Sequence, residues 1–127
     1  MIKLKDIPTH IKWFIQRVFR GYSDYDLIDY DQFVCKKILP SLKAWVAHKR
    51  YGYPESAGSF ENWNKILEEI VWAVEETATG KNEDDLYRHW EERGLTPEIR
   101  FKEVQKIWER QEHGMKLFGE YLGAMCD

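Results

Sequence analysis

The helical period of this sequence is clearest in the stretch SFENWNKILEEIVWAV, residues 59–74. Its large apolar side chains recur at the i, i+3, i+4 and i+7 spacing that gathers residues on one face of an α-helix. These side chains are Trp63, Ile66, Leu67, Ile70, Val71 and Val74. The stretch therefore predicts the strongest helix of the protein, opening at Ser59 or Phe60.

Upstream of this helix, the same period predicts two more. An apolar stripe runs from Ile7 to Phe19, with Gly21 placed to end the first helix. The second helix begins after Ser23, which with Asp26 three residues later resembles a capping box. Pro40 lies inside the apolar pattern of this helix, so we expect a kink or a break near Leu39.

Downstream, Gly80 and a run of polar residues predict a loop over residues 77–85. A short helix follows around Leu86 and Trp90, and it ends before Gly94. The sequence Thr96-Pro97-Glu98 combines a cap, a proline suited to the first turn and an acid that complements the positive helix end. It predicts the start of a last helix, which Gly114 is expected to bend.

Length and composition favour one small soluble domain over residues 1–127. No segment alternates apolar and polar residues between turns, so no strand is expected. The longest apolar run, Ile70 to Val74, is far shorter than the ~20 residues of a membrane helix. The N-terminus also lacks the apolar centre of a signal peptide, because Asp6 and other polar residues interrupt it. We predict a single all-α domain, a compact bundle of about five helices.

The two cysteines and the charges exclude some classes of protein. Cys35 and Cys126 are too few for a disulfide scaffold, and we expect both to be reduced, with Cys35 buried. Residues 1–50 carry a net charge of +5 and residues 51–127 one of −8. No dense basic block appears, so we expect the two halves to fold against each other and do not expect nucleic-acid binding.

A dense acidic cluster spans Asp24 to Asp31. Four carboxylates in eight residues could hold a divalent cation, yet Ile28 breaks the alternation that a calcium loop requires. Acids at a helix start also oppose the positive end of the helix dipole. Capping is the reading we favour; a metal site and an Asp/Tyr surface for a partner remain alternatives.

Nothing in the sequence matches a catalytic or cofactor motif. Four acids on the strongest helix recur at a spacing of seven, which places them on a face that we expect to be solvated: Glu68, Glu69, Glu75 and Glu76. The histidines lack the Glu-x-x-His spacing of di-iron bundles. Phosphate-binding glycine loops and nucleophile motifs are missing as well. We therefore expect no cofactor and no metal.

Exposed aromatic residues and small residues point to contacts between helices or proteins. Trp13 and Trp72 lie off the main apolar stripes of their helices and are the aromatics most expected at the surface. With Tyr22, Asp24, Tyr25 and Asp26 they make up the candidate partner-binding residues. The spacing of Gly119 and Gly123 predicts close helix packing, inside the domain or in a homo-oligomer. The stripe of the first helix is expected to cover the core, the alternative being a membrane-surface or targeting element.

Several segments, in order, resemble a functionally uncharacterised family of small all-helical bacteriophage proteins. They are Tyr22-Ser-Asp-Tyr-Asp-Leu27, Leu39-Pro-Ser-Leu-Lys43, Gly52-Tyr-Pro54, Trp63-Asn-Lys-Ile-Leu67 and Gly114-Met-Lys-Leu-Phe-Gly-Glu-Tyr121. The chain departs from the family at Ile28, where a Trp is expected, and at Cys126, before the closing Asp127. The resemblance covers about residues 20–127. It implies a viral origin and supplies no catalytic residue.

Taken together, these features lead us to expect a phage-encoded accessory protein that acts by binding a host or viral protein in the host cytoplasm. No membrane association is expected. The alternative is a divalent-cation-dependent enzyme, or a nucleotide or small-molecule binder, that uses the acids of residues 24–31 and 68–76. Ligand-dependent thermal melts distinguish the two classes.

Overall fold

The computed structural model describes residues 7–48 and 51–126, and Asp6 and Asp127 lie outside them. Five α-helices and no strand occur in these residues, which confirms the predicted all-α class. The α-helices are α1 (Thr9–Arg20), α2 (Tyr30–Ala47), α3 (Phe60–Thr79), α4 (Lys81–His89) and α5 (Pro97–Tyr121). Three single 3₁₀ turns complete the described structure: η2 (Tyr25–Leu27), η3 (Glu55–Ala57) and η4 (Leu122–Ala124).

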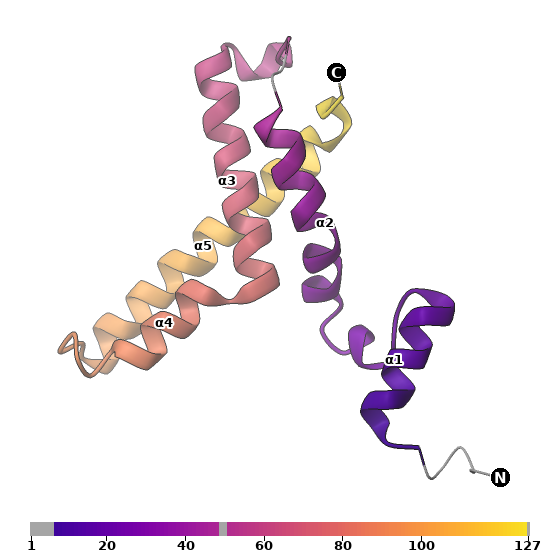
Figure 1. Cartoon of the computed structure of the whole chain (residues 1–127). Coiled ribbons are helices and arrows are strands. Elements are labelled where there is room, and N and C mark those ends of the chain that lie inside the picture. The colour runs from indigo at the N-terminus through magenta and orange to yellow at the C-terminus, as the bar shows by residue number, and fades with distance from the viewer. Residues whose placement is uncertain (1–6, 49–50, 127) are drawn as a thin grey trace.

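Helix α3 is the centre of the fold. Figure 1 shows α5 crossing α3, with α2 beside α3 and α4 beside the first half of α5. The strongest predicted helix is therefore also the most buried one, since Trp63, Leu67, Ile70 and Val74 are each at most 1% exposed. Side chains of α2 and α5 pack around them, among them Cys35, whose predicted burial is confirmed.

The expected helix ends are confirmed where a local signal encodes them. Ser59 Oγ accepts a hydrogen bond from the Asn62 amide at 3.0 Å, and Thr96 Oγ1 accepts one from the Ile99 amide at 3.3 Å. Gly21 ends α1 in the left-handed conformation, with φ at 85°. These signals act over three or four residues, so the sequence alone is enough to place them.

Other predicted boundaries are wrong. Helix α2 begins at Tyr30, because Ser23 and Asp26 open only the 3₁₀ turn η2. It then runs through Pro40, so the break that was one of the two outcomes expected near Leu39 does not occur. The predicted loop over residues 77–85 is reduced to Gly80, which separates α3 from α4.

Gly114 lies inside a continuous helix, at the point where α5 crosses α3. A Cβ atom there would stand 2.5 Å from the carbonyl oxygen of Glu69 and against the Cβ of Ala73. By contrast, no atom lies within 4 Å of a Cβ built on Gly119 or Gly123. The close packing that we expected at Gly119 and Gly123 inside the domain is therefore found at Gly114 instead.

Candidate functional site

Helix α1 is bound to the chain through its polar face. The guanidinium of Arg17 donates two hydrogen bonds to the Asp26 carboxylate, at 2.8 and 3.1 Å. Gln16 and Asp24 exchange a pair of hydrogen bonds at 2.8 and 2.9 Å, and Arg20 forms an ion pair with Asp24. Bidentate pairing fixes orientation as well as distance. These contacts hold α1 against residues 22–27.

Asp26 is the centre of this attachment. Besides the Arg17 guanidinium, its carboxylate accepts the backbone N–H of Ser23 at 2.8 Å, while its own N–H donates to Ser23 Oγ at 3.2 Å. Hydrogen bonds from Arg17, and then from Ser23, hold the pKa of Asp26 well below its usual range. The reciprocal hydrogen bonds of the predicted capping box form, but at the 3₁₀ turn η2 rather than at the start of α2, and the same carboxylate also anchors α1.

Two aromatic contacts strengthen the same attachment. The rings of Trp13 and Tyr25 lie 4.6 Å apart between centroids, and the Arg20 guanidinium lies 4.4 Å from the centre of the Tyr22 ring. Trp13 is therefore half-buried against a neighbour rather than exposed. We define the α1 unit as residues 9–27, joined by these contacts.

The apolar face of α1 is turned outward. Phe14 is 65% exposed, Phe19 is 85% exposed, and none of the residues of α1 is buried. We call the exposed apolar side chains of this helix the α1 stripe; they are Ile11, Phe14, Ile15, Val18 and Phe19. The expectation that this stripe covers the core is wrong, because α1 lies beyond the N-terminal end of α2 (Figure 1). The polar face is the one that the chain itself uses.

The six predicted partner-binding residues fall in two places. Five of them lie together in the α1 unit: Trp13, Tyr22, Asp24, Tyr25 and Asp26. Their main role there is to fix α1. Trp72 lies apart on α3, half-buried, with the Arg110 guanidinium 4.1 Å from its ring centre. The α1 stripe, which the sequence argument assigned to the core, is the exposed apolar surface of the α1 unit.

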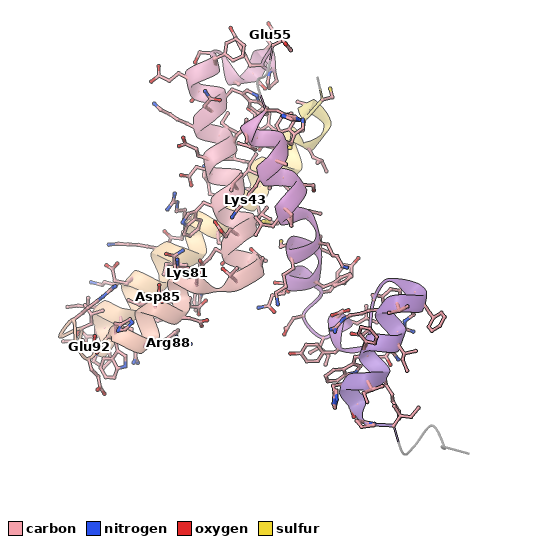
Figure 2. The ribbon with its side chains drawn as sticks, in the orientation of Figure 1. Lys43, Glu55, Lys81, Asp85, Arg88 and Glu92 are labelled. Carbon is pink, nitrogen blue, oxygen red and sulfur yellow. The ribbon has the colours of Figure 1, made fainter. Side chains whose placement is uncertain are left out.

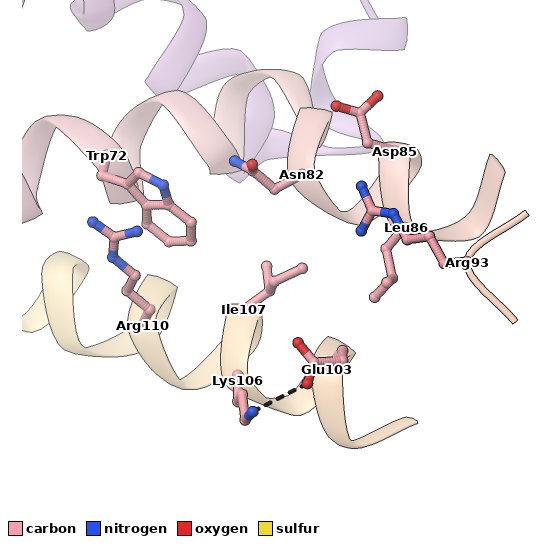
Figure 3. A pocket seen from close by; sticks show the side chains of 9 residues that line it. All are labelled: Trp72, Asn82, Asp85, Leu86, Arg93, Glu103, Lys106, Ile107 and Arg110. Carbon is pink, nitrogen blue, oxygen red and sulfur yellow. Dashed lines mark hydrogen bonds and ion pairs between the residues drawn. The ribbon is translucent and has the colours of Figure 1, made fainter. Parts of the chain in front are cut away.

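A polar pocket of about 360 Å³ lies where α3, α4 and α5 meet. Figure 3 shows Trp72 and Arg110 at one end of this pocket and Arg93 at the other. Its ion pairs form within the protein: Arg110 holds Glu69 through two hydrogen bonds of 3.0 Å, and Lys106 pairs with Glu103 at 3.0 Å. The Arg110 guanidinium keeps the pKa of Glu69 below its usual value. The Arg110–Glu69 pair connects α5 to α3, and the Lys106–Glu103 pair lies within α5.

The four acids of α3 form a solvated face only in part: Glu68 is exposed and Glu69 and Glu75 are partly exposed in ion pairs, but Glu76 is buried. Glu76 is 4% exposed and accepts the Asn82 and Glu83 amides, each at 3.1 Å, at the start of α4. Glu75 pairs with Lys43 of α2 at 2.8 Å. Figure 2 shows Lys43 beside α3, and shows charges of both signs along α4 at Lys81, Asp85 and Arg88 and in the turn after it at Glu92. Across residues 7–48 and 51–126, no group of three His, Cys, Asp or Glu residues could hold a metal ion.

An apolar groove, which the sequence argument did not predict, lies between the C-terminal half of α2 and the end of α5. It has a volume of about 330 Å³. It is lined by Ile38, Ser41, Leu42, Trp45, Phe118, Leu122 and Met125, and we call it the α2–α5 groove. The sequence signal nearest to this groove was the spacing of Gly119 and Gly123, which predicts that another helix can approach α5 closely there.

Comparison with protein families, with curated sequences and with solved structures finds no match to this chain. Within the described residues, no helix is both long enough and apolar enough to span a bilayer.

Proposed function

We propose that this protein acts by binding another protein through the α1 stripe. The observation that supports the proposal is the orientation of α1, whose polar face is tied down by Asp24 and Asp26 while its apolar face is open. All five residues of the stripe are at least 40% exposed, and Phe14 and Phe19 alone leave most of two large aromatic side chains in solvent. A contiguous exposed apolar patch of a few hundred Å² is typical of interaction sites.

The chemistry of the stripe favours a protein partner. Phe14 and Phe19 are rigid aromatic side chains that can fill pockets on a folded surface. Among the Lys and Arg residues of α1, Lys12 alone has no ion pair in the described structure, because Arg17 and Arg20 are bound to Asp26 and Asp24. A helix that binds a membrane surface typically carries several free basic residues on its polar face. The described face of α1 offers less attraction to anionic lipids than its sequence suggested.

The resemblance to small bacteriophage proteins adds a setting to this proposal. We propose a phage-encoded accessory protein that works in the host cytoplasm, with a host or viral protein as its partner. Five of the carboxylates that a cation-dependent enzyme would use, those of Asp24, Asp26, Glu69, Glu75 and Glu76, are instead bound to basic side chains or to the start of α4. That pairing favours the binding function over the enzymatic alternative.

The test compares three tagged forms of the protein in an extract of phage-infected cells. These are the wild type, the stripe variant Phe14→Ser/Phe19→Ser, and the control Phe101→Ser, which removes an aromatic side chain that is 57% exposed on α5. We expect the wild type and the control to retain the same protein and the stripe variant to lose it. Equal retention by all three forms would contradict the proposal. So would a clear rise in melting temperature with magnesium, manganese or a nucleotide.

A further inference from the structure

A cleft of about 360 Å³ lies between the α1 unit and the first half of α2. Three elements line it, and we call it the α1–α2 cleft: Arg17 of α1, Tyr25 and Asp26 of η2, and Phe33, Lys36 and Lys37 of α2. A narrow extension of about 60 Å³ adds Asp29 and Gln32. The wider part falls within the range of volumes that binding pockets have.

Two ammonium groups of this cleft carry a charge that the protein does not neutralise. The Arg17 guanidinium is paired with Asp26, whereas Lys36 and Lys37 are exposed and form no ion pair with any described residue. The Nζ atom of Lys37 lies 5.8 Å from the centre of the Phe33 ring, so the charge borders an aromatic side chain. The Tyr25 ring, on the η2 side of the cleft, is 50% exposed. The cleft therefore combines uncompensated positive charge with accessible aromatic surface.

The acidic part of the chain does not supply the missing carboxylates. Residues 7–48 carry six Lys and Arg against four Asp and Glu, and residues 51–126 carry nine against sixteen. Between described residues of these two segments, Lys43–Glu75 is the one ion pair. The expected cancellation of charge between the two halves is therefore slight. An acidic partner is repelled by residues 51–126 and attracted to the end that carries α1.

The α1–α2 cleft adjoins the α1 stripe. Arg17, which lines the cleft, follows Phe14 of the stripe by three positions, and residues at this spacing are neighbours on a helix surface. Figure 1 shows α1 beyond the N-terminal end of α2, away from the α3–α5 crossing. One partner can therefore cover Phe14 and reach Lys36 and Lys37 without displacing α1.

We propose that the partner of the α1 stripe is an acidic protein, and that it places a segment with carboxylates around an aromatic side chain in the α1–α2 cleft. The inference rests on the proposed function, since it states the chemistry of the protein that the stripe binds. The carboxylates face Lys36 and Lys37, and the aromatic ring packs against Phe33 and Tyr25. A nucleic acid also offers anions and rings, but its phosphate backbone does not suit the apolar stripe beside the cleft.

The probe that tests the cleft is a capped five-residue peptide, a phenylalanine flanked by two glutamates on each side. An NMR titration at low salt should show saturable binding to the wild type, with the shifted resonances around Phe33 and Lys36. The cleft variant Lys36→Glu/Lys37→Glu should bind at least about tenfold more weakly. Raising the salt from about 0.05 M to about 0.5 M should weaken wild-type binding, because it screens exposed charges.

The matched control is Lys102→Glu/Lys116→Glu, which reverses two exposed lysines of α5 and gives the same net charge as the cleft variant. It should bind the peptide with nearly the wild-type affinity. All four substitutions alter exposed side chains, so circular dichroism should show an unchanged helix content.

Several results would overturn the inference. One is the absence of peptide binding by the wild type, and another is equal affinity of the cleft and control variants. A peptide with glutamine in place of glutamate that bound equally well would show that the cleft does not recognise carboxylates. An oligothymidylate of the same charge that bound more tightly than the peptide would assign the cleft to nucleic acid instead.

The failure of this inference is separable from that of the proposed function. If the cleft variant bound no less peptide than the control, and the stripe variant Phe14→Ser/Phe19→Ser still lost its protein from the extract, the binding function would stand with a partner of other chemistry. If the stripe variant retained the same proteins as the wild type, the proposed function would fail, and with it the link between the cleft and the stripe.

Discussion

At the scale of single residues, Gly114 shows how closely α3 and α5 approach. Backbone atoms of Glu69 and the side chain of Ala73 occupy the space that a Cβ at this position would need. Neither neighbour is the far end of a flexible side chain, so the two helices would have to move apart. The identity of this residue therefore sets the distance between the two longest helices.

We expect Gly114→Ala to lower the free energy of unfolding by about 1–3 kcal/mol, because overpacking at a tight crossing strains both helices. Urea denaturation measures the change. The matched control is Gly119→Ala on the same helix, where no atom lies within 4 Å of the new Cβ. There the higher helix propensity of alanine should leave stability unchanged or raise it by about 0.5–1 kcal/mol. Equal effects at the two positions would contradict the role assigned to the crossing.

At the scale of secondary-structure elements, the start of α4 depends on a side chain from α3. The Glu76 carboxylate accepts the backbone amides of Asn82 and Glu83, and also the Asn82 side-chain amide at 2.7 Å. These amides belong to the first turn of α4, where the positive end of the helix dipole favours a negative charge. A buried acid thus takes the place of a local cap.

We expect Glu76→Ala to lower the free energy of unfolding by about 0.5–2 kcal/mol, since it removes the acceptor that caps the first-turn amides of α4. Amide hydrogen exchange should show faster exchange at the start of α4. Glu68→Ala, at an exposed position of the same helix, provides the control and should stay within about 0.5 kcal/mol of the wild type. Equal free energies of unfolding for Glu76→Ala and Glu68→Ala would show that the Glu76 carboxylate does not cap α4.

The attachment of α1 is an element-scale feature that depends on pH. The pKa of Asp26 is lowered in the folded protein, first by the Arg17 guanidinium and then by the Ser23 amide. A lowered folded-state pKa means that the stabilisation is present above the unfolded value of about 3.9 and is lost as the pH falls through the folded one. We therefore expect α1 to loosen only below about pH 4.

The indole N–H resonance of Trp13, whose ring contacts Tyr25, reports this change in an NMR titration. In Asp26→Asn the resonance should already have its low-pH position at neutral pH. The exposed Asp31→Asn serves as the control and should titrate like the wild type. A Trp13 signal that does not move in the acid range would show that Asp26 does not hold the helix.

At the scale of the whole molecule, α1 and the packed body have separate contacts. The buried cluster and the side chains packed against it come from α2, η3, α3, α5 and the C-terminal segment, and none comes from the α1 unit. The body should therefore fold without its first 28 residues. In this respect the described chain differs from a bundle whose helices all share one core.

We expect deletion of residues 1–28 to leave a cooperative thermal transition followed by circular dichroism. Its midpoint should lie within about 5 °C of that of the Phe14→Ser/Phe19→Ser variant, a shift that corresponds to about 1 kcal/mol or less. That variant is the proper reference, because in both proteins the stripe cannot contribute to association. Loss of the cooperative transition would show that α1 supports the core.

The sequence by itself determined the helices and several of their ends. The period of Trp63, Leu67, Ile70 and Val74 and the caps at Ser59 and Thr96 act within one or two turns, so they can be read without a fold. The sequence also named five residues of the α1 unit, together with Trp72, as partner-binding candidates. Their role in holding α1 was not predicted, because it depends on pairs such as Arg17–Asp26 that span nine residues.

Only the tertiary structure decided which face of α1 is covered, where Glu76 lies and where the groove forms. An amphipathic pattern states that a helix has two faces, but not which of them finds a partner in the same chain. Here strong, directional pairs from Asp24 and Asp26 bind the polar face, and the apolar face is left outward. The hydrophobic effect is non-directional, so it favours burial of the apolar face of α1 without specifying the surface that covers it. The positions of the directional polar contacts decide whether that surface belongs to the same chain or to another one.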